Sequence, residues 1–314
     1  MDARTVADAR ADGGGRAIGA AAQRADRIRP VAAHRRSEVR VKRRNQGLGN
    51  VESPGLFRWE GHPWGAPGPE EGWVVVEAPL EIAVGDTLVA VLMHTPGLEK
   101  ELAVGYCLGE GIVSSAEDIA SVDTDGGDVT KRVSVRLRPG AGLDAEKLAK
   151  PRFVRSGCAA NAPGDWACTV PPLGAGVEVA DAALRGAPKL LAAAQESYRV
   201  AGGIHAAGVF TASGEAVVVC EDIGRHNAVD KALGACVLRG IPLGDKFLLG
   251  TGRASYEFVT KSARLGVSVV ASFSSPTSLS VQLADVLNQT LVGYLRPHRF
   301  VVYTHPWRIR RAEP

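Results

Sequence analysis

Short strands and one helix are predicted in the part of the chain that follows the first fifty-odd residues. Three β-rich runs come first, with Pro79 between the first two and the hairpin signal Gly85-Asp86 between the last two. Apolar residues at four-residue spacing then indicate a helix, and strict alternation indicates a half-buried strand. This half is typical of a small α+β unit. The predicted strands are residues 73–77, 80–84, 87–93 and 132–138, and the predicted helix is 98–108.

In the second half, strands and helices alternate, and the strands are apolar on both faces. This pattern predicts a largely parallel sheet covered by helices, with antiparallel strands at its edges. Ser213-Gly214 marks a second hairpin. The expected fold class is therefore α/β. The predicted strands are residues 207–212, 215–220, 246–250, 267–273, 290–295 and 299–304, and the predicted helices are 227–238, 254–265 and 277–287.

Charge is distributed unevenly along the 314 residues. The net charge is +3, but residues 1–50 alone carry +7, so the rest of the chain is mildly acidic, at −4. The first thirty residues lack Phe, Trp and Tyr and cannot bury much apolar surface, so we expect a disordered basic tail over residues 1–55. This tail is either solvated (or an over-extended start) or a basic arm for an acidic partner. The acidic remainder does not favour nucleic-acid binding.

Two classes of protein are excluded by composition. No run of about 18 apolar residues predicts a membrane span, and residues 17–22 are too short an apolar stretch for a secretory signal.

Five cysteines in 314 residues are sparse and odd in number, which favours free thiols in a reducing, cytoplasmic compartment. No two of them have zinc-site spacing, and the Pro-Cys-x-x-Cys of zinc deaminases is missing, so we expect no zinc or other metal site.

A loop cysteine is the first candidate for chemistry. Cys158 lies in a Pro- and Gly-rich stretch between the two halves, where a thiol is accessible. Arg155 stands three residues before it and can favour the thiolate, the reactive form of sulfur. The alternative is an inert surface thiol.

Polar residues crowd the junction between a predicted buried strand and the helix after it. Residues 219–231 read VCEDIGRHNAVDK, and ligands bind at this edge of open α/β sheets. His226 or Asn227 can cap the helix, and Arg225 can face an anion. The alternative is a capping network with salt bridges on the helix surface.

A glycine-containing turn follows the next predicted strand, at residues 250–255 (GTGRAS). Backbone N–H groups at a helix start bind phosphate, and Arg253 adds a cationic group. The alternative is a tight turn in which Ser255 caps the helix. Residues 274–278 repeat the arrangement at the following junction, and two such junctions at adjacent strand ends favour a shared anion site.

A basic stretch lies between the last two predicted strands, at residues 293–299 (GYLRPHR). Tyr294 can stack on a base or a pterin ring, and Arg296 and Arg299 can pair with phosphates. The alternative is a basic hairpin turn with the tyrosine packed on the core.

Seven long motifs follow one another along the predicted folded region. They are EAPLEIAV (77–84), HTPGLEKELAVGYCLGEGIV (94–113), GGIHAA (202–207), EDIGRHNAVDK (221–231), TGRASYEFVTKSA (251–263), SSPTSLSVQLA (274–284) and TLVGYLRPHRFVVYTH (290–305). In these motifs the sequence resembles the formate dehydrogenase accessory sulfurtransferase family, FdhD. The likeness covers roughly residues 57–307, almost all of the predicted folded region.

This resemblance implies a sulfur carrier, or sulfurtransferase, that serves formate dehydrogenase. By the family's role, Cys158 would accept sulfur from a cysteine desulfurase as a persulfide and pass it to the molybdenum cofactor in its bis(molybdopterin guanine dinucleotide) form. It also implies a homodimer and a three-layer mixed sheet similar to that of cytidine deaminases, without zinc. The cofactor-binding stretch would fall on Tyr294, Leu295, Arg296, Pro297, His298 and Arg299. From the helix-start argument we add Arg225, Arg253 and Ser255, with a guanine nucleotide as the mimic of the cofactor.

The family's Cys-x-x-Cys motif is incomplete in this chain. It falls on residues 158–161, where Asn161 replaces the second cysteine, and Cys168 is the nearest thiol that can substitute for it. The missing cysteine favours one alternative, a cofactor-binding chaperone without sulfur transfer. The implied fold leaves a second alternative, a metal-free deaminase relative that acts on another nucleotide. The expected segments are a tail (1–55), an α+β subdomain (56–150), a cysteine-bearing loop (151–172), an α/β domain (173–307) and a short end (308–314).

Overall fold

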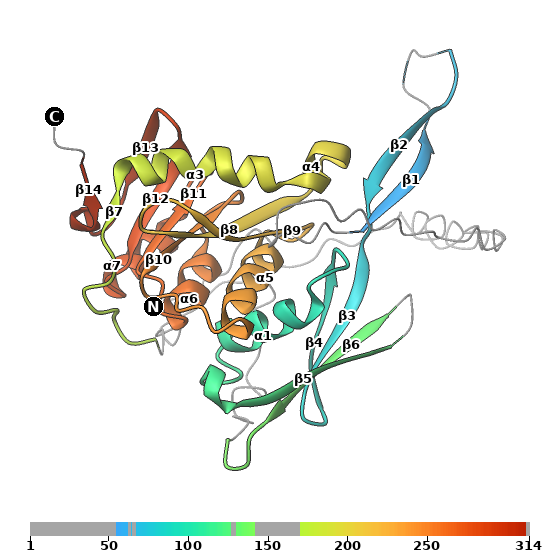
Figure 1. Cartoon of the computed structure of the whole chain (residues 1–314), viewed down its shortest axis with the longest axis horizontal. Helices are drawn as coiled ribbons and strands as arrows, with labels where there is room; N and C mark the ends of the chain where they lie inside the picture. Colours follow the sequence, from blue (N-terminus) through green and yellow to red (C-terminus); the bar gives the residue numbers. More distant parts are fainter. Residues whose placement is uncertain (1–54, 62–63, 65–66, 127–129, 142–169, 312–314) are drawn as a thin grey trace, which may run out of the picture. The chain divides into compact units, whose positions relative to one another are not determined.

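Six strands form the larger sheet of the computed structural model, in the order β13-β12-β11-β10-β8-β9 (Figure 1). β10, β11 and β12 are parallel to one another, whereas β8 is antiparallel to both β10 and β9. The strands β9, β10, β11 and β12 therefore all run in one direction. Their bounds are β8 (His205–Thr211), β9 (Ala216–Asp222), β10 (Lys246–Gly250), β11 (Val269–Ser272), β12 (Thr290–Arg296) and β13 (Arg299–Val302). The structure describes residues 55–61, 64, 67–126, 130–141 and 170–311.

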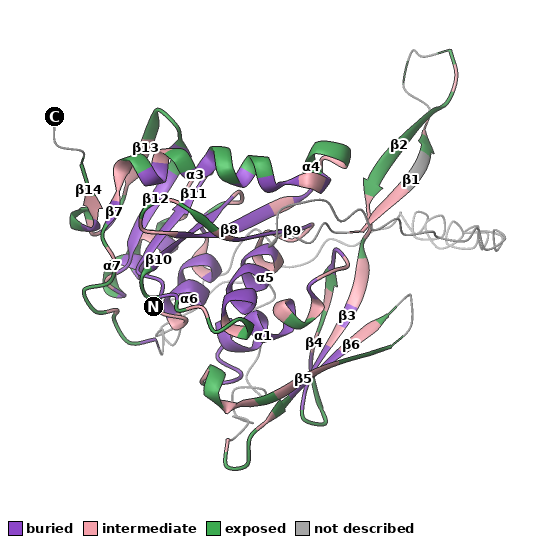
Figure 2. Ribbon diagram, in the orientation of Figure 1, coloured by how far each residue is buried: buried purple, intermediate pink, exposed green. Residues whose placement is uncertain are grey.

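Helices cover both faces of this sheet and give three layers. One core cluster joins α3 to one face, and a second joins α5, α6 and α7 to the other. Figure 2 shows the buried residues concentrated between these layers. The bounds are α3 (Asp181–Ala194), α5 (Arg225–Leu238), α6 (Tyr256–Arg264) and α7 (Ser278–Val286).

The two-sided burial explains why the central parts of the sheet strands are apolar on both faces. In β10, Phe247 and Leu249 pack toward α3, whereas Leu248 between them packs toward α5. Successive side chains of a strand point to opposite faces, so a strand that is covered on both sides needs a continuous apolar run. Phe247 also stacks on Phe210, with ring centroids 5.2 Å apart.

A second sheet and one helix come from the amino-terminal half. Its order is β4-β3-β6-β5, with β3 parallel to β6 and the other pairs antiparallel. The helix α1 packs on this sheet and, on its other side, on α5. The bounds are β3 (Ala78–Val84), β4 (Thr87–His94), α1 (Glu99–Gly109), β5 (Ile119–Gly126) and β6 (Lys131–Leu137).

Two glycines allow α1 and α5 to cross at very short range. A Cβ atom on Gly105 would lie 1.9 Å from the carbonyl oxygen of Asp230, and one on Gly234 would lie 1.9 Å from that of Glu101. No side chain fits at such distances, so glycine is required at both positions for this backbone approach.

Smaller elements complete the described part of the chain. β1 (Leu56–Gly61) and β2 (Glu70–Val75) form an antiparallel pair, and β7 (Val179–Ala180) pairs with β14 (Ile309–Arg310). The helix α4 (Glu196–Ala201) follows α3 directly. Two short 3₁₀ turns lie at Ala116–Asp118 and Pro306–Arg308.

The structure confirms most of the predicted elements and the α/β class, and corrects two details. Pro79 does not separate two strands but lies inside β3, where β6 pairs only from Leu80 onward, so its missing N–H breaks no bond on that side. The antiparallel strand β8 is internal and not at an edge, because its hairpin partner β9 is the outer strand. The expected tail over residues 1–55 and the cysteine-bearing loop fall almost entirely outside the described residues. The likeness to cytidine deaminases stays a prediction.

We predict that Gly105→Ala lowers the free energy of unfolding by about 1–3 kcal/mol, because the new methyl group forces α1 away from α5. Gly186→Ala is the matched control, since Gly186 lies in α3 with nothing within 4 Å of its Cβ position. This second change should be neutral or stabilising by up to about 1 kcal/mol. Urea unfolding measures both, and equal stability of the two variants would show that the helices do not cross this closely.

Candidate functional site

The carboxyl ends of β9, β10, β11 and β12 meet at one edge of the larger sheet, because these strands share a direction. The loops after β9, β10 and β11 lead directly into α5, α6 and α7, so three helices begin at this edge. β8 runs the other way and starts there with His205, which pairs with Asp222. We call this the carboxyl edge. Such an edge is where open α/β sheets bind ligands.

A buried ion pair fixes the loop between β9 and α5. Lys231 Nζ lies 2.7 Å from Asp222 Oδ2, and both side chains are buried. Lys231 Nζ also donates to the carbonyl of Thr95 at 2.7 Å, and the Thr95 N–H donates to Asp222 at 3.1 Å. The other carboxylate oxygen of Asp222 accepts from the Gly224 N–H and the Asn227 side chain. This network ties the start of α5 to the chain that leaves β4.

The neighbouring carboxylate, Glu221, supports α4 and not the ligand edge. It accepts hydrogen bonds from the N–H groups of Ser197 and Tyr198, at 2.9 and 3.0 Å. Burial raises the pKa of Glu221, and these two hydrogen bonds oppose that rise. Glu221 therefore acts as a side-chain acceptor for the first N–H groups of this short helix.

A second buried cluster joins α1, α5 and α6. Lys261 Nζ lies 2.5 Å from Asp230 Oδ2 and 2.9 Å from Glu110 Oε1. Burial lowers the pKa of Lys261, but the two carboxylates more than offset this, so the pKa rises above its usual value. The ammonium group is therefore charged at neutral pH and holds the three helices together.

Arg225 stands at the first position of α5 and faces the loop after β10. Its side chain packs against Gly252, where a Cβ atom would lie 2.7 Å from Arg225 Cδ. Arg225 Nε is buried and has no hydrogen-bond partner among the described residues. Burial, and then the charge of Arg225, lower the pKa of His205, whose Nδ1 lies 3.2 Å from the Thr251 hydroxyl. The edge thus holds a cation and a histidine that stays neutral.

Ser255, His226 and Glu257 form a line of contacting side chains at the same edge, with a hydrogen bond between the first two and an ion-pair contact between the last two. Ser255 Oγ lies 2.9 Å from His226 Nε2, and His226 Nδ1 lies 2.5 Å from Glu257 Oε2. Burial lowers the pKa of His226, and the hydrogen bond with Glu257 opposes this shift. Ser255 precedes α6, yet its side chain does not bond to the backbone of that helix.

Backbone hydrogen bonds connect the three adjacent loops of the carboxyl edge. Ser272 Oγ donates to the carbonyl of Gly252 at 2.5 Å, and the Ala254 N–H donates to the carbonyl of Ser275. The Tyr294 N–H donates to the carbonyl of Ser274 at 3.0 Å. Segments that are 20 to 40 residues apart in the sequence therefore lie side by side, as we expected for two junctions at adjacent strand ends.

The β12–β13 turn presents part of the expected cofactor stretch to solvent. Tyr294 is about half exposed and has a positive φ of 52°. Arg296 donates to the carbonyl of Phe273 at 2.8 Å, and its guanidinium lies over that phenyl ring. Leu295 is fully buried in the core, so only its backbone can face a ligand. Exposed side chains at the turn are Pro297, His298 and Arg299.

The structure thus brings Arg225, Ser255 and the Tyr294–Arg299 stretch to one edge, and Arg253 is exposed in the loop between them. Cys158 and Cys168 lie outside the described residues. Within the described part of the chain, the cysteines are Cys107, Cys220 and Cys236, and all three are buried. Burial raises the pKa of Cys220 to about 12 and that of Cys236 to about 11, which keeps both protonated.

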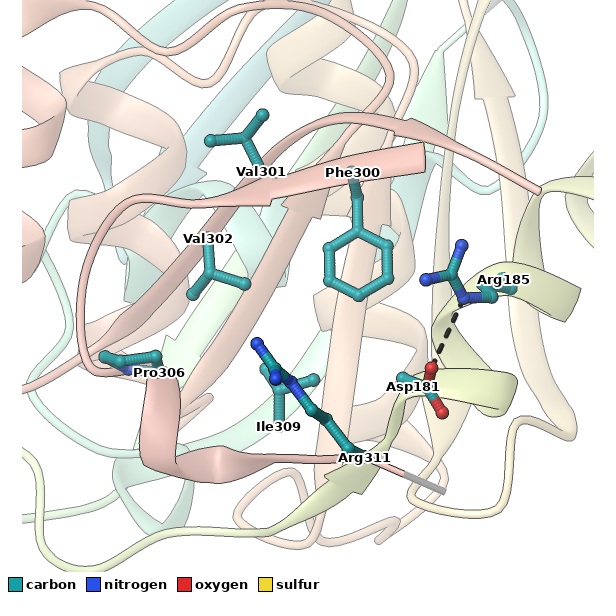
Figure 3. Close-up of a pocket in the computed structure, with 8 residues that line it drawn as sticks. All are labelled: Asp181, Arg185, Phe300, Val301, Val302, Pro306, Ile309 and Arg311. Carbon is teal, nitrogen blue, oxygen red and sulfur yellow. Dashed lines mark hydrogen bonds and ion pairs between the residues drawn. The ribbon is translucent and has the colours of Figure 1, made fainter. Parts of the chain in front are cut away.

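A pocket of about 740 Å³ lies elsewhere, between α3 and the carboxyl-terminal strands (Figure 3). The Phe300 ring lies below the guanidinium of Arg185, which pairs with Asp181 at 3.3 Å. None of the carboxyl-edge residues named above lines it. The lining residues are Asp181, Arg185, Phe300, Val301, Val302, Pro306, Ile309 and Arg311.

The FdhD/NarQ family matches residues 75–310, about three quarters of the sequence. The chain belongs to the FdhD/NarQ family. The sulfur carrier protein FdhD of Mycolicibacterium paratuberculosis is 38% identical over 248 residues, which cover 75% of this chain and 91% of that protein. The sulfur carrier protein FdhD of Sulfurisphaera tokodaii is 35% identical over 244 residues, which cover 76% and 92%.

A solved structure supports the fold of this FdhD/NarQ family member. The crystal structure of a candidate formate dehydrogenase accessory protein from Desulfotalea psychrophila superimposes with a TM-score of 0.66 and 26% sequence identity. The match covers 81% of this chain and 98% of the other. No helix in the described part of this chain is long and apolar enough to cross a bilayer.

Sequence reasoning missed two functional-looking features of this FdhD/NarQ chain. The sequence analysis did not single out Glu257. A signal was present, because Glu257 lies two residues after Ser255, in the first turn of a predicted helix. From there its carboxylate can contact a histidine of the neighbouring helix. Thr95 was missed because its role is carried by backbone groups that reach Asp222 and Lys231, more than 120 residues away. No local pattern signals such a contact.

We predict that Lys231→Met lowers the free energy of unfolding by about 3–5 kcal/mol, because it leaves the Asp222 carboxylate buried without its counter-charge. Adding Asp222→Asn should recover part of that loss. Arg136→Met is the control: it breaks an exposed pair with Asp123 and should cost less than about 1 kcal/mol. Denaturant unfolding compares the three, and a Lys231→Met cost as small as the control's would show that the pair is dispensable.

Proposed function

We propose that this chain is a sulfur carrier that accepts sulfur as a persulfide on Cys158 and passes it to the molybdenum cofactor of a formate dehydrogenase. The relatives that cover three quarters of the chain are named as sulfur carrier proteins, and this observation supports the proposal most strongly. In this proposal the sulfur donor is a cysteine desulfurase. The protein works in the cytoplasm as a homodimer and, within a cytidine-deaminase-like sheet, uses no zinc.

The cysteines that the structure describes are poorly suited to carry sulfur, and this favours Cys158 as the carrier. Cys107, Cys220 and Cys236 are buried, and the raised pKa of the last two disfavours the thiolate that sulfur exchange requires. In the proposed step, the Cys158 thiolate attacks the outer sulfur of the donor's persulfide. A new sulfur–sulfur bond forms on Cys158, the donor's sulfur–sulfur bond breaks, and the donor leaves as a thiolate.

Delivery of that sulfur as sulfide needs two electrons. A second thiol supplies them when it attacks the persulfide at Cys158, forms a disulfide and releases sulfide to the metal. Asn161 occupies the position of the second cysteine and cannot do this, so the proposal assigns the step to Cys168. If no second thiol acts, the chain binds cofactor without transferring sulfur, and this chaperone role is the alternative that Asn161 favours.

The carboxyl edge supports the choice of a phosphorylated substrate. Three helix starts, the buried unpartnered Nε of Arg225 and the exposed Arg253 provide positive potential for phosphates. The half-exposed ring of Tyr294 and the cationic side chains of Arg296 and Arg299 lie at the same edge. In our proposal this surface holds the guanine dinucleotide arms of the molybdenum cofactor, with guanosine diphosphate as a soluble mimic.

We predict that wild-type protein incubated with a cysteine desulfurase and cysteine gains the mass of one sulfur atom, and that Cys158→Ala does not. Cys168→Ala should still load, because the resolving thiol acts after loading. Cys236→Ala is the control and should load normally, since this thiol is buried. Intact-protein mass spectrometry with and without reductant gives the result. Absence of any gain in both the wild type and Cys168→Ala, which cannot release the sulfur through Cys168, would contradict the carrier and favour the chaperone.

A further inference from the structure

Three side chains at the carboxyl edge are linked in the order Ser255, His226, Glu257. His226 Nδ1 lies 2.5 Å from Glu257 Oε2, an ion-pair contact, and because a carboxylate can only accept, the tautomer that suits this contact carries its proton on Nδ1. The lowered pKa of His226 keeps the ring neutral at pH 7, so Nε2 retains its lone pair. Ser255 Oγ, at 2.9 Å, therefore donates its hydroxyl proton to Nε2. This is the polarity that activates a serine nucleophile.

The adjacent helix shows that the side chain of Ser255 is not an ordinary cap. Thr277 occupies the equivalent place before α7, at the end of the next parallel strand, and its hydroxyl accepts from the Ser280 N–H in a capping box. Ser255 has nearly the same extended backbone, with φ −97° and ψ 173°, against −95° and 158° for Thr277. Its hydroxyl nevertheless bonds to His226. The backbone conformation at Ser255 is therefore one that permits capping, but the hydroxyl bonds to His226 and not to the backbone of α6.

The three residues have the graded exposure that a nucleophile and its supports require. Ser255 is partly exposed, the His226 side chain is 20% exposed, and the Glu257 side chain is 11% exposed. A reagent in solvent can therefore reach the hydroxyl, while the carboxylate stays shielded behind the ring. Shielding strengthens the hydrogen bond that orients the imidazole.

Positive charge surrounds this group of side chains. Arg225 precedes His226 in the chain and its buried Nε has no partner among the described residues, while Arg253 is exposed two residues before Ser255. Ser255 also lies at the start of the nine-residue helix α6, whose dipole stabilises negative charge there. The site therefore suits a reaction in which an oxyanion forms on a substrate that is itself anionic.

We propose that Ser255, His226 and Glu257 form a catalytic triad that hydrolyses carboxylic esters bearing a neighbouring negative charge. Ser255 Oγ bonds to the acyl carbon while its proton moves to His226 Nε2, and the leaving alcohol takes that proton as its bond to the acyl carbon breaks. Water then attacks the acyl-serine, His226 accepts a proton from it, and the carboxylic acid leaves as the proton returns to Ser255. Water is the only co-reactant, and no electrons are exchanged.

Each residue has a distinct role in this inference. Ser255 is the nucleophile and His226 the general base, so both touch the reacting atoms. Glu257 is a positioning residue that fixes the tautomer of His226. Arg225 selects substrates by charge. The inference goes beyond the proposed sulfur transfer and does not rest on it, because ester hydrolysis needs neither Cys158 nor a sulfur donor.

The first test is covalent labelling of the full-length protein with diisopropyl fluorophosphate, followed by peptide mass spectrometry. We expect one adduct, on Ser255, and at least about 100-fold slower labelling in His226→Gln. Ser278→Ala is the control, since Ser278 is an exposed serine at the start of α7. A label on another serine, no label, or an unchanged rate in His226→Gln would overturn the proposal.

The second test is the hydrolysis of p-nitrophenyl acetate and of its anionic counterpart, mono-p-nitrophenyl glutarate. Ser255→Ala should abolish both activities, and Glu257→Gln should lower kcat with KM unchanged, which a purely structural role would not produce. Arg225→Met should raise KM for the anionic ester only. Thermal unfolding of each variant confirms that it folds. Equal activity of wild type and Ser255→Ala would contradict the triad whatever the outcome of sulfur loading.

Discussion

The common direction of β9, β10, β11 and β12 is the constraint on which the rest of this structure depends. Hydrogen-bond ladders force their carboxyl ends to one edge, and each short loop there leads into a helix. The starts of α5, α6 and α7 are thereby collected with their dipoles pointing the same way. Cations, a neutral histidine and a serine hydroxyl from separate segments meet as a consequence of that geometry. The helix starts alone make the carboxyl edge favourable for anionic ligands, and the side chains add to this effect.

Buried charge holds this edge to the amino-terminal half. The Asp222–Lys231 pair binds backbone groups of Thr95 after β4, and Lys261 joins Asp230 of α5 to Glu110 after α1. The close crossing at Gly105 and Gly234 brings the helices near enough for these contacts. A helix that slipped by one turn would leave these buried charges unpaired, which is costly in the protein interior.

Periodicity and turn chemistry predicted most of the fold. They located the strands at 246–250 and 290–295 and the helices between them, because each is an uninterrupted run bounded by glycine or polar residues. The helix α3 was not predicted, although Leu184, Ala187 and Leu191 have helical spacing. An internal proline, Pro188, and a high alanine content conceal it. The internal place of β8 depends on pairing with β10, which lies about 40 residues away, and sequence pattern does not specify partners.

The sequence predicted which segments form the candidate site, but it did not predict which side chains contact one another there. We recognised Arg225, Arg253 and Ser255 because they lie near predicted helix starts, and Tyr294 because it lies in a basic stretch between the last two predicted strands. The common strand direction places these residues together. Capping of α6 by the Ser255 hydroxyl was the alternative interpretation of that turn, and the structure instead directs the hydroxyl to His226, a contact that the sequence does not indicate. The burial of Leu295 depends on an irregularity that no pattern signals: the β12 register shifts between Gly293 and Arg296 and Tyr294 has a positive φ, so Leu295 packs in the same core cluster as Val292.

A crystal structure of this protein with guanosine diphosphate is the most direct test of the central claim that the carboxyl edge holds a phosphorylated ligand. The account predicts that the phosphates lie within hydrogen-bond distance of Arg225 or of the first N–H groups of α6, with the base against Tyr294. Binding instead in the pocket lined by Phe300 and Arg185 (Figure 3), with the carboxyl edge empty, would contradict it.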